Sequence, residues 1–566
     1  MCRTGWLGGL LLAVVLVAAV GAAEFEQRWV YVSQNLYVDK NIDTVIALME
    51  RAKKAGYTGM VLADSKFGRL PQMDKRYFDN VARVVEAAKR LQFDIIPAIF
   101  PIGYSESLLS QDVNLAAGVP VKGAPFVVKG GVAEPVMAER TVFKNGDFEQ
   151  VEGSRFASYD FQDGIGQSSF ADTQTVHQGK VSLRMENIGQ ADPQYGHCRL
   201  MQTVEVEPFQ YYHLSVWVKT SDFTAANEAK LMMLSDVVEA HNYLNLGVKP
   251  TQDWTQHHIV FNSLSATQVK IYLGVWGGKT GTIWWDDLRL EPAGLVNILR
   301  RDLCPLAVTN DDGSITYEEG RDFEPVADPK LGQKLWPGSY DAWHEPPVFK
   351  LTANSRIKEG ETLRLSYFHP MLIYDDQVGC SLEDPKVFAI MKDQMVRMHQ
   401  LFHAPGYFMS YDEIRVGGWE AMPDGRTLTS GQKLAEHVRK ATQMVRETAP
   451  GAAVYVWSDM FDPTHNARDR YYLVEGTLKG AWEGLDPQVV IVNWNHGKRD
   501  ESLKWFADRG AKQVIAGYYD GKPEGVRTWL ESAAKVKDVT GIMYTTWQNK
   551  YTDLEPFLDA VRQYKP

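Results

Sequence analysis

Cysteine is scarce in this chain, which has four in 566 residues. Cys2 stands before the apolar run of the N-terminus, and Cys198, Cys304 and Cys380 are far apart in the sequence. Disulfide-stapled domains and zinc sites need closely and regularly spaced cysteines. The sequence therefore predicts neither a disulfide framework nor a cysteine-based metal centre.

Positive charge is also in short supply, because 60 Lys and Arg face 71 Asp and Glu, a net charge of −11. Nucleic-acid-binding proteins need a basic face for phosphates, so we do not expect a nucleic-acid partner. No glycine-rich phosphate loop follows the first apolar strand, which argues against an open, doubly wound dinucleotide-binding sheet. Beyond the N-terminus, no apolar segment is long enough to span a membrane.

The N-terminal sequence, MCRTGWLGGLLLAVVLVAAVGAAEFEQ, is typical of a secretory signal peptide over residues 1–23. Arg3 supplies the positive start, and Leu10 to Val20 form a short apolar core. We expect cleavage near Ala23 and a secreted or periplasmic mature protein. An uncleaved membrane anchor is the alternative, but the apolar run is short for a bilayer.

Both ends of the chain alternate short apolar strands with segments of helical periodicity. Strands are expected at 29–38, 59–67, 93–103, 406–413, 452–462, 488–497, 513–521 and 541–551. Helices are expected at 42–56, 79–92, 385–402, 431–449, 473–484, 501–509, 524–537 and 553–564. Eight strand–helix units predict an α/β fold, a (β/α)₈ TIM barrel built from residues 24–141 and 363–566.

The middle of the chain differs in character, with many short strands of period two and no helices. Residues 142–293 are predicted to form a β-sandwich that interrupts the barrel after its third strand, and 294–362 a β-rich connection. NGDFE near the start and WWDDLRLEP near the end resemble jelly-roll carbohydrate-binding modules. That resemblance implies a structural calcium ion held by Asp147, Glu149 and Asp287; plain turn residues are the alternative.

Two adjacent acids, Asp412 and Glu413, follow the fourth barrel strand, GYFMSYDE. Active sites of TIM barrels lie at the C-terminal ends of the strands. The next four strands end in aromatic and hydrogen-bonding residues, among them Trp457, Trp494, Tyr518 with Asp520, and Trp547 with Asn549. Aromatic walls with polar groups between them suit a sugar, so the expected partner is a glycan. Adjacent strand residues point to opposite faces, so both acids reach one site only where the strand kinks or ends.

An Asp-Glu pair on strand four, Trp on strands five, six and eight, and Tyr-Tyr-Asp on strand seven resemble glycoside hydrolase family 20, the β-N-acetylhexosaminidases. The resemblance implies a retaining hydrolase in which the substrate's 2-acetamido oxygen is the nucleophile, without a cofactor. Glu413 would protonate the glycosidic oxygen, with a negative Asp412 nearby helping to keep it protonated. Asp412 would hold the acetamido N–H, and Tyr518 would donate to its carbonyl oxygen. Asp520 would bind hydroxyls, and Trp457, Trp494 and Trp547 would form the walls.

Two positions depart from the family pattern. Strand one has Gln34 and Asn35 where the family has an Arg, and we expect these two residues to bind the sugar in its place through weaker, uncharged contacts. Asn549 stands where the family has an acid after the strand-eight Trp. Both changes concern recognition of the outer sugar hydroxyls, so galacto-configured sugars and an endo-acting mode like that of family 123 stay open.

Three functions fit the sequence. The first is the substrate-assisted N-acetylhexosaminidase. The second is a glycosidase with two enzymic carboxylates, pairing Glu413 with Asp520 or Asp459. The third is a secreted polysaccharide-binding protein whose barrel has lost activity.

Overall fold

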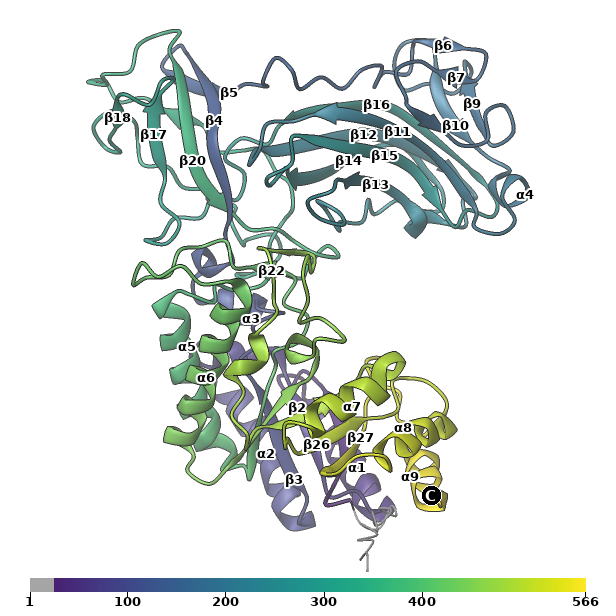
Figure 1. The fold of residues 1–566 in the computed structure, drawn as a ribbon, viewed down its shortest axis with the longest axis vertical. Helices are drawn as coiled ribbons and strands as arrows, with labels where there is room; N and C mark the ends of the chain where they lie inside the picture. Colours follow the sequence, from purple (N-terminus) through teal and green to yellow (C-terminus); the bar gives the residue numbers. More distant parts are fainter. Residues whose placement is uncertain (1–24, 566) are drawn as a thin grey trace, which may run out of the picture.

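The computed structural model describes residues 25–565, and Figure 1 shows a barrel with helices below two β-rich domains. The barrel is closed and consists of eight parallel strands in the order β1-β2-β3-β21-β23-β25-β26-β27. The strands are β1 (Gln27–Ser33), β2 (Gly59–Ala63), β3 (Asp94–Ile99), β21 (Gly406–Met409), β23 (Ala453–Trp457), β25 (Val490–Asn493), β26 (Gln513–Ala516) and β27 (Val539–Tyr544). The predicted eight-stranded barrel is thus confirmed.

The barrel interior is a packed core rather than a channel. Each strand contributes a buried side chain to one cluster that includes Trp29, Val61, Ile96, Phe408 and Met543. Trp457, at the end of β23, closes this cluster and is only 2% exposed. The chemistry of the barrel therefore has to take place above the core, at the strand ends.

Amphipathic helices cover the outside of the barrel. They are α1 (Asp39–Ala55), α2 (Lys75–Leu91), α5 (Pro385–Phe402), α6 (Ser430–Thr448), α7 (Arg499–Ala507), α8 (Val526–Ala533) and α9 (Leu554–Gln563). Local signals fix their starts: Asp74 caps α2, and Thr429 with Gln432 forms a capping box on α6. The predicted helix at 473–484 is wrong, because Gly476 and Gly480 adopt positive φ and leave only the short strand β24 (Leu473–Val474) and a 3₁₀ turn.

Two antiparallel sheets form the predicted β-sandwich. One has the order β14-β12-β16-β10-β9 and the other β13-β15-β11-β8. Their strands are β8 (Phe161–Gln162), β9 (Ser169–Asp172), β10 (Ser182–Met185), β11 (His197–Glu205), β12 (Tyr211–Ser221), β13 (Ala229–Leu234), β14 (Gln252–Asn262), β15 (Gln268–Trp276) and β16 (Thr282–Pro292). All of them belong to the segment between barrel strands β3 and β21.

A third antiparallel sheet, of order β18-β17-β20-β4-β5-β19, stands beside the sandwich. Its strands are β4 (Val119–Lys129), β5 (Val132–Pro135), β17 (Ala307–Asn310), β18 (Thr316–Tyr317), β19 (Phe349–Lys350) and β20 (Thr362–His369). Strands β4 and β5 fall in the segment 24–141 and β20 in 363–566, both of which the sequence assigned to the barrel. They pair with each other instead, since β4 runs antiparallel to β20 from Val119–His369 to Val127–Thr362.

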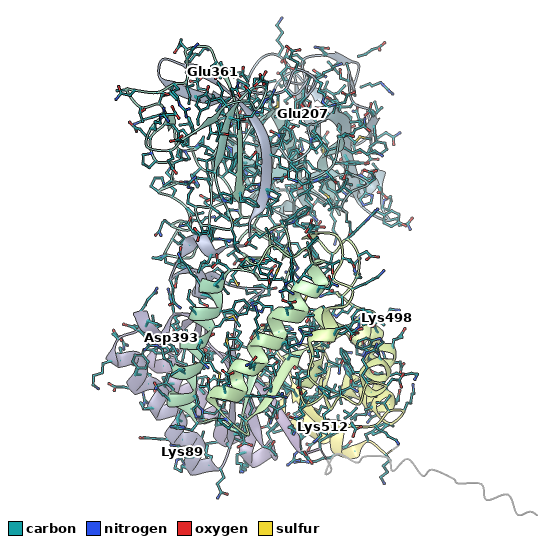
Figure 2. The ribbon with its side chains drawn as sticks, turned by 60° about the vertical axis from the view of Figure 1, so that its left-hand side comes forward. Lys89, Glu207, Glu361, Asp393, Lys498 and Lys512 are labelled. Atoms are coloured by element: carbon teal, nitrogen blue, oxygen red, sulfur yellow. The ribbon has the colours of Figure 1, made fainter. Side chains whose placement is uncertain are left out.

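The C-terminal ends of the barrel strands face the β domains. In Figure 2, Lys512 at the start of β26 lies near the far end of the barrel, whereas Glu207 and Glu361 mark the β domains. Buried ion pairs fasten this junction: Arg301 lies 2.6 Å from Glu420 and 3.2 Å from Asp384. Within residues 25–565 no helix is both long and apolar enough to cross a bilayer, and the predicted signal peptide lies outside the described residues.

Candidate active site

A cavity of about 570 Å³ opens at the C-terminal ends of the barrel strands, a size that suits a sugar-sized ligand. Every barrel strand or the loop after it contributes to its wall. The lining residues are Tyr31, Ser33, Ala63, Asp64, Ser65, Phe67, Gly68, Ala98, Ile99, Pro101, Tyr104, Glu106, Ser107, Gln394, Ser410, Asp412, Glu413, Trp457, Trp494, Tyr519, Trp547 and Asn549.

One half of the cavity is aromatic. Trp457 forms its buried floor, with the rings of Tyr31 and Trp547 centred 6.0 and 5.9 Å away. Tyr519 lies parallel to Trp494, with ring centres 6.0 Å apart. Trp547 and Tyr519 are 44% and 45% exposed, so these large apolar faces are available to a ligand. Such faces complement the C–H surfaces of a pyranose ring.

The acid pair lies in the other half, where β21 ends at Met409 and the chain turns into the cavity. Glu413 adopts a left-handed conformation, with φ of 49°. This turn removes the strand alternation, so Asp412 and Glu413 both line the cavity although they are neighbours in the sequence. Gly103 packs against the turn, and a Cβ atom there would lie 1.9 Å from the Asp412 carbonyl oxygen.

Four residues hold Glu413 in place. Its Oε1 atom lies 2.7 Å from the Arg415 guanidinium, and its Oε2 atom accepts a hydrogen bond from the Tyr104 hydroxyl. Its backbone amide donates to Asp459 Oδ2 at 2.8 Å, and its carbonyl accepts from Gln377 at 2.9 Å. The Glu413 side chain remains 25% exposed, so the carboxylate is fixed yet open to the cavity.

Two aspartates near Glu413 hold their protons unusually tightly. Burial, followed by the charges of Asp459 and Glu413, raises the pKa of Asp412 to about 8. Burial also raises the pKa of Asp459 to about 7, although hydrogen bonds from the Glu413 amide, Asn466 and Trp494 act in the opposite direction. Like charges this close resist joint ionisation, so Asp412 and Asp459 titrate as a coupled pair. The sequence predicted a negative Asp412, whereas its raised pKa keeps this residue largely protonated at neutral pH.

A further carboxyl group, Glu106, lines the cavity from the loop after β3. It is half-buried at the start of the short helix α3 (Glu106–Leu109). Burial and the charge of Asp376 raise its pKa to about 7. Asp64, in contrast, is engaged by the Leu36 amide at 3.0 Å and the Tyr77 hydroxyl at 2.9 Å, and so braces the loop after β2.

Six of the residues predicted from the sequence come together in this cavity: Asp412, Glu413, Trp457, Trp494, Trp547 and Asn549. Four predicted contacts are absent from its wall. Tyr518 lies beyond the end of β26 at Ala516, and its hydroxyl donates to Asp553 at 2.6 Å. Tyr519 takes its place in the wall. Asp520 accepts from the Trp547 amide at 2.7 Å and thereby fixes that residue.

The strand-one pair is also outside the cavity wall. Asn35 Oδ1 accepts from the Tyr37 amide at 3.0 Å, where it shapes the turn before α1, and the Gln34 backbone amide donates to Ala63. Tyr31 and Ser33 of β1, which precede them in the chain, line the cavity instead. Tyr104, Glu106 and Arg415 were not predicted from the sequence, although the first two follow β3 at the rim where barrel sites form.

Two of the three acids assigned to calcium in the sandwich have protein partners in the structure. Glu149 accepts hydrogen bonds from the Lys180 and Val181 amides, and Asp287 lies 3.3 Å from His177 and 3.5 Å from Arg289. Asp147 is exposed. Across residues 25–565, no group of three or more His, Cys, Asp or Glu side chains is arranged to hold a metal ion.

No protein-family model and no curated protein matches the chain. Among solved structures, a glycoside hydrolase family 20 β-N-acetylglucosaminidase is similar at a TM-score of 0.34 and 8% identity, over 96% of this chain and 70% of that one. The rhamnosidase from Novosphingobium sp. PP1Y follows at 0.33 and 12%, over 95% of this chain but only 58% of its own length.

A smaller structure, TmCBM61 in complex with β-1,4-galactotriose, has a TM-score of 0.21 and 20% identity. It covers 27% of this chain and 99% of its own. Likenesses this distant carry no argument about activity, so the function has to be inferred from the cavity itself.

Proposed function

We propose that the protein is a glycoside hydrolase that cleaves β-linked N-acetylhexosamine by substrate-assisted, retaining catalysis. The observation that carries the proposal is the turn at Glu413, which brings two adjacent carboxyl groups into one aromatic-walled cavity. Neither Asp520 nor Asp459, the partners named for a two-carboxylate mechanism, lines that cavity. A carboxyl pair on one side of the sugar suits a reaction in which the substrate supplies its own nucleophile.

The first step forms a bond between the 2-acetamido carbonyl oxygen and C1 of the sugar, while the bond from C1 to the glycosidic oxygen breaks. Glu413 gives its proton to the departing oxygen, as a general acid. Asp412 accepts the acetamido N–H and stabilises the positive oxazolinium. Tyr519, which lines the cavity, takes the role of Tyr518 in this proposal and donates to the acetamido oxygen. In the second step Glu413 takes a proton from water. The water oxygen attacks C1, and the bond from C1 to the acetamido oxygen breaks, which opens the oxazolinium ring.

The raised pKa of Asp412 bears on how the protein binds the acetamido group. In the free protein at neutral pH the proton resides on Asp412, whose half-buried carboxyl is partly desolvated and repelled by its neighbours. A bound acetamido N–H donates to Asp412, and a hydrogen bond of this kind favours the ionised form. Binding of an N-acetylated sugar should therefore ionise Asp412, whose charge then stabilises the positive oxazolinium.

A hexosamine thiazoline, which mimics the cyclic intermediate, tests this proposal. The wild type should bind it, as measured by calorimetry, and Asp412→Asn should bind it at least tenfold more weakly because a contact to the intermediate is lost. Asp302→Asn, at an exposed aspartate, serves as the matched control and should bind like the wild type. Equal affinity of Asp412→Asn and wild type would contradict the assigned role.

A second candidate function has one observation in its favour. Glu106 lines the same cavity with a raised pKa, so it could pair with Glu413 in a glycosidase that uses two enzymic carboxylates. In that case Glu106→Gln should lose roughly 10²-fold or more in kcat, as an essential acid or base does. Under substrate assistance the kcat/KM of the same variant should fall less than about tenfold, mainly because KM rises.

A further inference from the structure

One loop of the β-sandwich reaches the rim of the barrel beside the acid pair. It lies between β13 and β14 and includes Tyr243 and Asn245. The Tyr243 carbonyl accepts from the Tyr374 amide at 3.1 Å. Asn245 donates twice to the Asp375 carboxylate, through its amide and its side chain, at 2.9 Å each. The sandwich therefore docks on the barrel side through a specific polar contact.

The Tyr243 ring continues this contact towards the cavity. It packs on Tyr472 with ring centres 4.4 Å apart and on Tyr374 at 6.2 Å. The hydroxyl groups of Tyr374 and Tyr472 are hydrogen-bonded to each other at 2.8 Å. Tyr374 and Tyr472 both have positive φ, of 50° and 48°. Turns in this conformation depend on surrounding contacts, which the sandwich loop provides.

These two tyrosines in turn surround Arg415. The centre of its guanidinium group lies 5.1 Å from the Tyr374 ring and 5.0 Å from the Tyr472 ring, within the range of cation–π attraction. The Arg415 side chain is only 9% exposed and forms the ion pair with Glu413 at 2.7 Å. It also donates to the Tyr104 hydroxyl at 3.2 Å. A continuous set of contacts thus runs from Tyr243 of the sandwich to the carboxylate of Glu413.

We propose that Tyr243 is a positioning residue for catalysis: the inserted β-sandwich sets Arg415, through Tyr374 and Tyr472, and Arg415 holds Glu413. This rests on the proposed role of Glu413 as general acid. The sandwich would then contribute to the reaction itself, apart from any glycan that it binds. Loss of the Tyr243 ring should affect the chemical step more than substrate binding, because Tyr243 is not among the cavity-lining residues.

The kinetic test compares Tyr243→Ala, Tyr243→Phe and, as a matched control, Tyr272→Ala, a half-buried tyrosine of β15 in the same domain. On an aryl 2-acetamido glycoside with a poor leaving group, kcat of Tyr243→Ala should fall about tenfold with KM within about twofold. Tyr243→Phe keeps the ring and should act like the wild type, as should Tyr272→Ala. Equal losses in Tyr243→Ala and Tyr272→Ala would overturn the proposal, because damage to the sandwich alone would explain both.

A double-mutant cycle shows whether Tyr243 acts through Arg415. In an Arg415→Gln background, Tyr243→Ala should change kcat by less than about twofold, since the group that it positions is already gone. The same fold loss in both backgrounds would overturn the proposed route.

A crystal structure of Tyr243→Ala tests whether Tyr243 positions Arg415 without an activity measurement. The proposal expects the guanidinium of Arg415 to lie more than about 4 Å from the Glu413 carboxylate, beyond ion-pair distance. An unchanged contact overturns it. If the wild type hydrolyses no 2-acetamido glycoside, the proposed function fails, yet this structure still shows whether Tyr243 sets Arg415.

Discussion

Replacing Asp412 by asparagine should stabilise the fold at neutral and alkaline pH while it damages activity. Burial, with the charges of Asp459 and Glu413, raises the pKa of Asp412 from 3.8 to about 8. The unfolded chain therefore releases this proton near pH 4, whereas the folded protein keeps it until about pH 8. Because the folded state holds the extra proton in this window, the wild type loses stability as pH rises through it. An asparagine has no proton to release and avoids that loss.

The size of the effect follows from the pKa difference. At pH 7 the solution is 3.2 pH units above the pKa of 3.8 that Asp412 has in the unfolded chain. Each pH unit is worth about 1.4 kcal/mol, which gives an upper limit of about 4 kcal/mol. The Asp412 side chain is half-buried, so water screens part of this, and we expect about 1–3 kcal/mol. In a barrel of more than 250 residues, 1 kcal/mol shifts Tm by less than about 2 °C, so we expect a rise in Tm of roughly 1–5 °C.

Thermal unfolding between pH 4 and pH 9 measures this difference. The Tm of Asp412→Asn should equal that of the wild type near pH 4 and exceed it increasingly up to about pH 8. Asp302→Asn, at an exposed site, should show no such trend. A variant that is no more stable than the wild type at pH 8, or one with the same offset at pH 4, would show that Asp412 does not carry the raised pKa.

Three further substitutions separate the roles of the cavity residues. Glu413→Gln should lower kcat roughly 10²–10⁴-fold on alkyl glycosides and much less on 4-nitrophenyl glycosides, whose leaving group needs little protonation; equal losses on both would exclude a general acid. Tyr519→Phe should lower kcat about tenfold whereas Tyr518→Phe should not, since only Tyr519 lines the cavity, and the reverse order would restore the sequence-based assignment. Trp547→Ala should raise KM about tenfold with a smaller effect on kcat, because its exposed ring offers a stacking face; an unchanged KM would remove it from the binding site.

The barrel could be predicted from the sequence because its signals are local. Each strand is a short apolar run, and most are followed by a helix with a clear apolar periodicity and a capping residue such as Asp74 or Thr429. The sheet that joins β4 to β20 has no such signal. Strands β4 and β20 are more than two hundred residues apart in the sequence, and only the folded chain shows that they pair.

Within the site, the residue types were predictable but the register was not. Alternation of side chains ends where a strand ends, so the sequence could not decide between Tyr518 and Tyr519 or between Gln34 and Ser33. The left-handed turn at Glu413 is equally invisible, yet it is what lets both acids face one cavity. Arg415 and Tyr243 could not be predicted from the sequence because their roles depend on contacts between distant segments.

The comparison that bears most directly on substrate assistance is the ratio of kcat/KM for matched 4-nitrophenyl β-glycosides with and without the 2-acetamido group. Gluco- and galacto-configured pairs should both be measured, because the sequence departs from the family 20 pattern at the positions that recognise the outer sugar hydroxyls. If the substrate supplies the nucleophile, the acetamido sugar of at least one pair should react at least about 10³-fold faster than its plain counterpart, the scale expected when a well-placed internal nucleophile is lost. Equal rates within each pair would contradict substrate assistance and favour Glu106 as an enzymic nucleophile or base. No turnover of any glycoside would contradict a hydrolase altogether and favour a barrel that binds glycan without cleaving it.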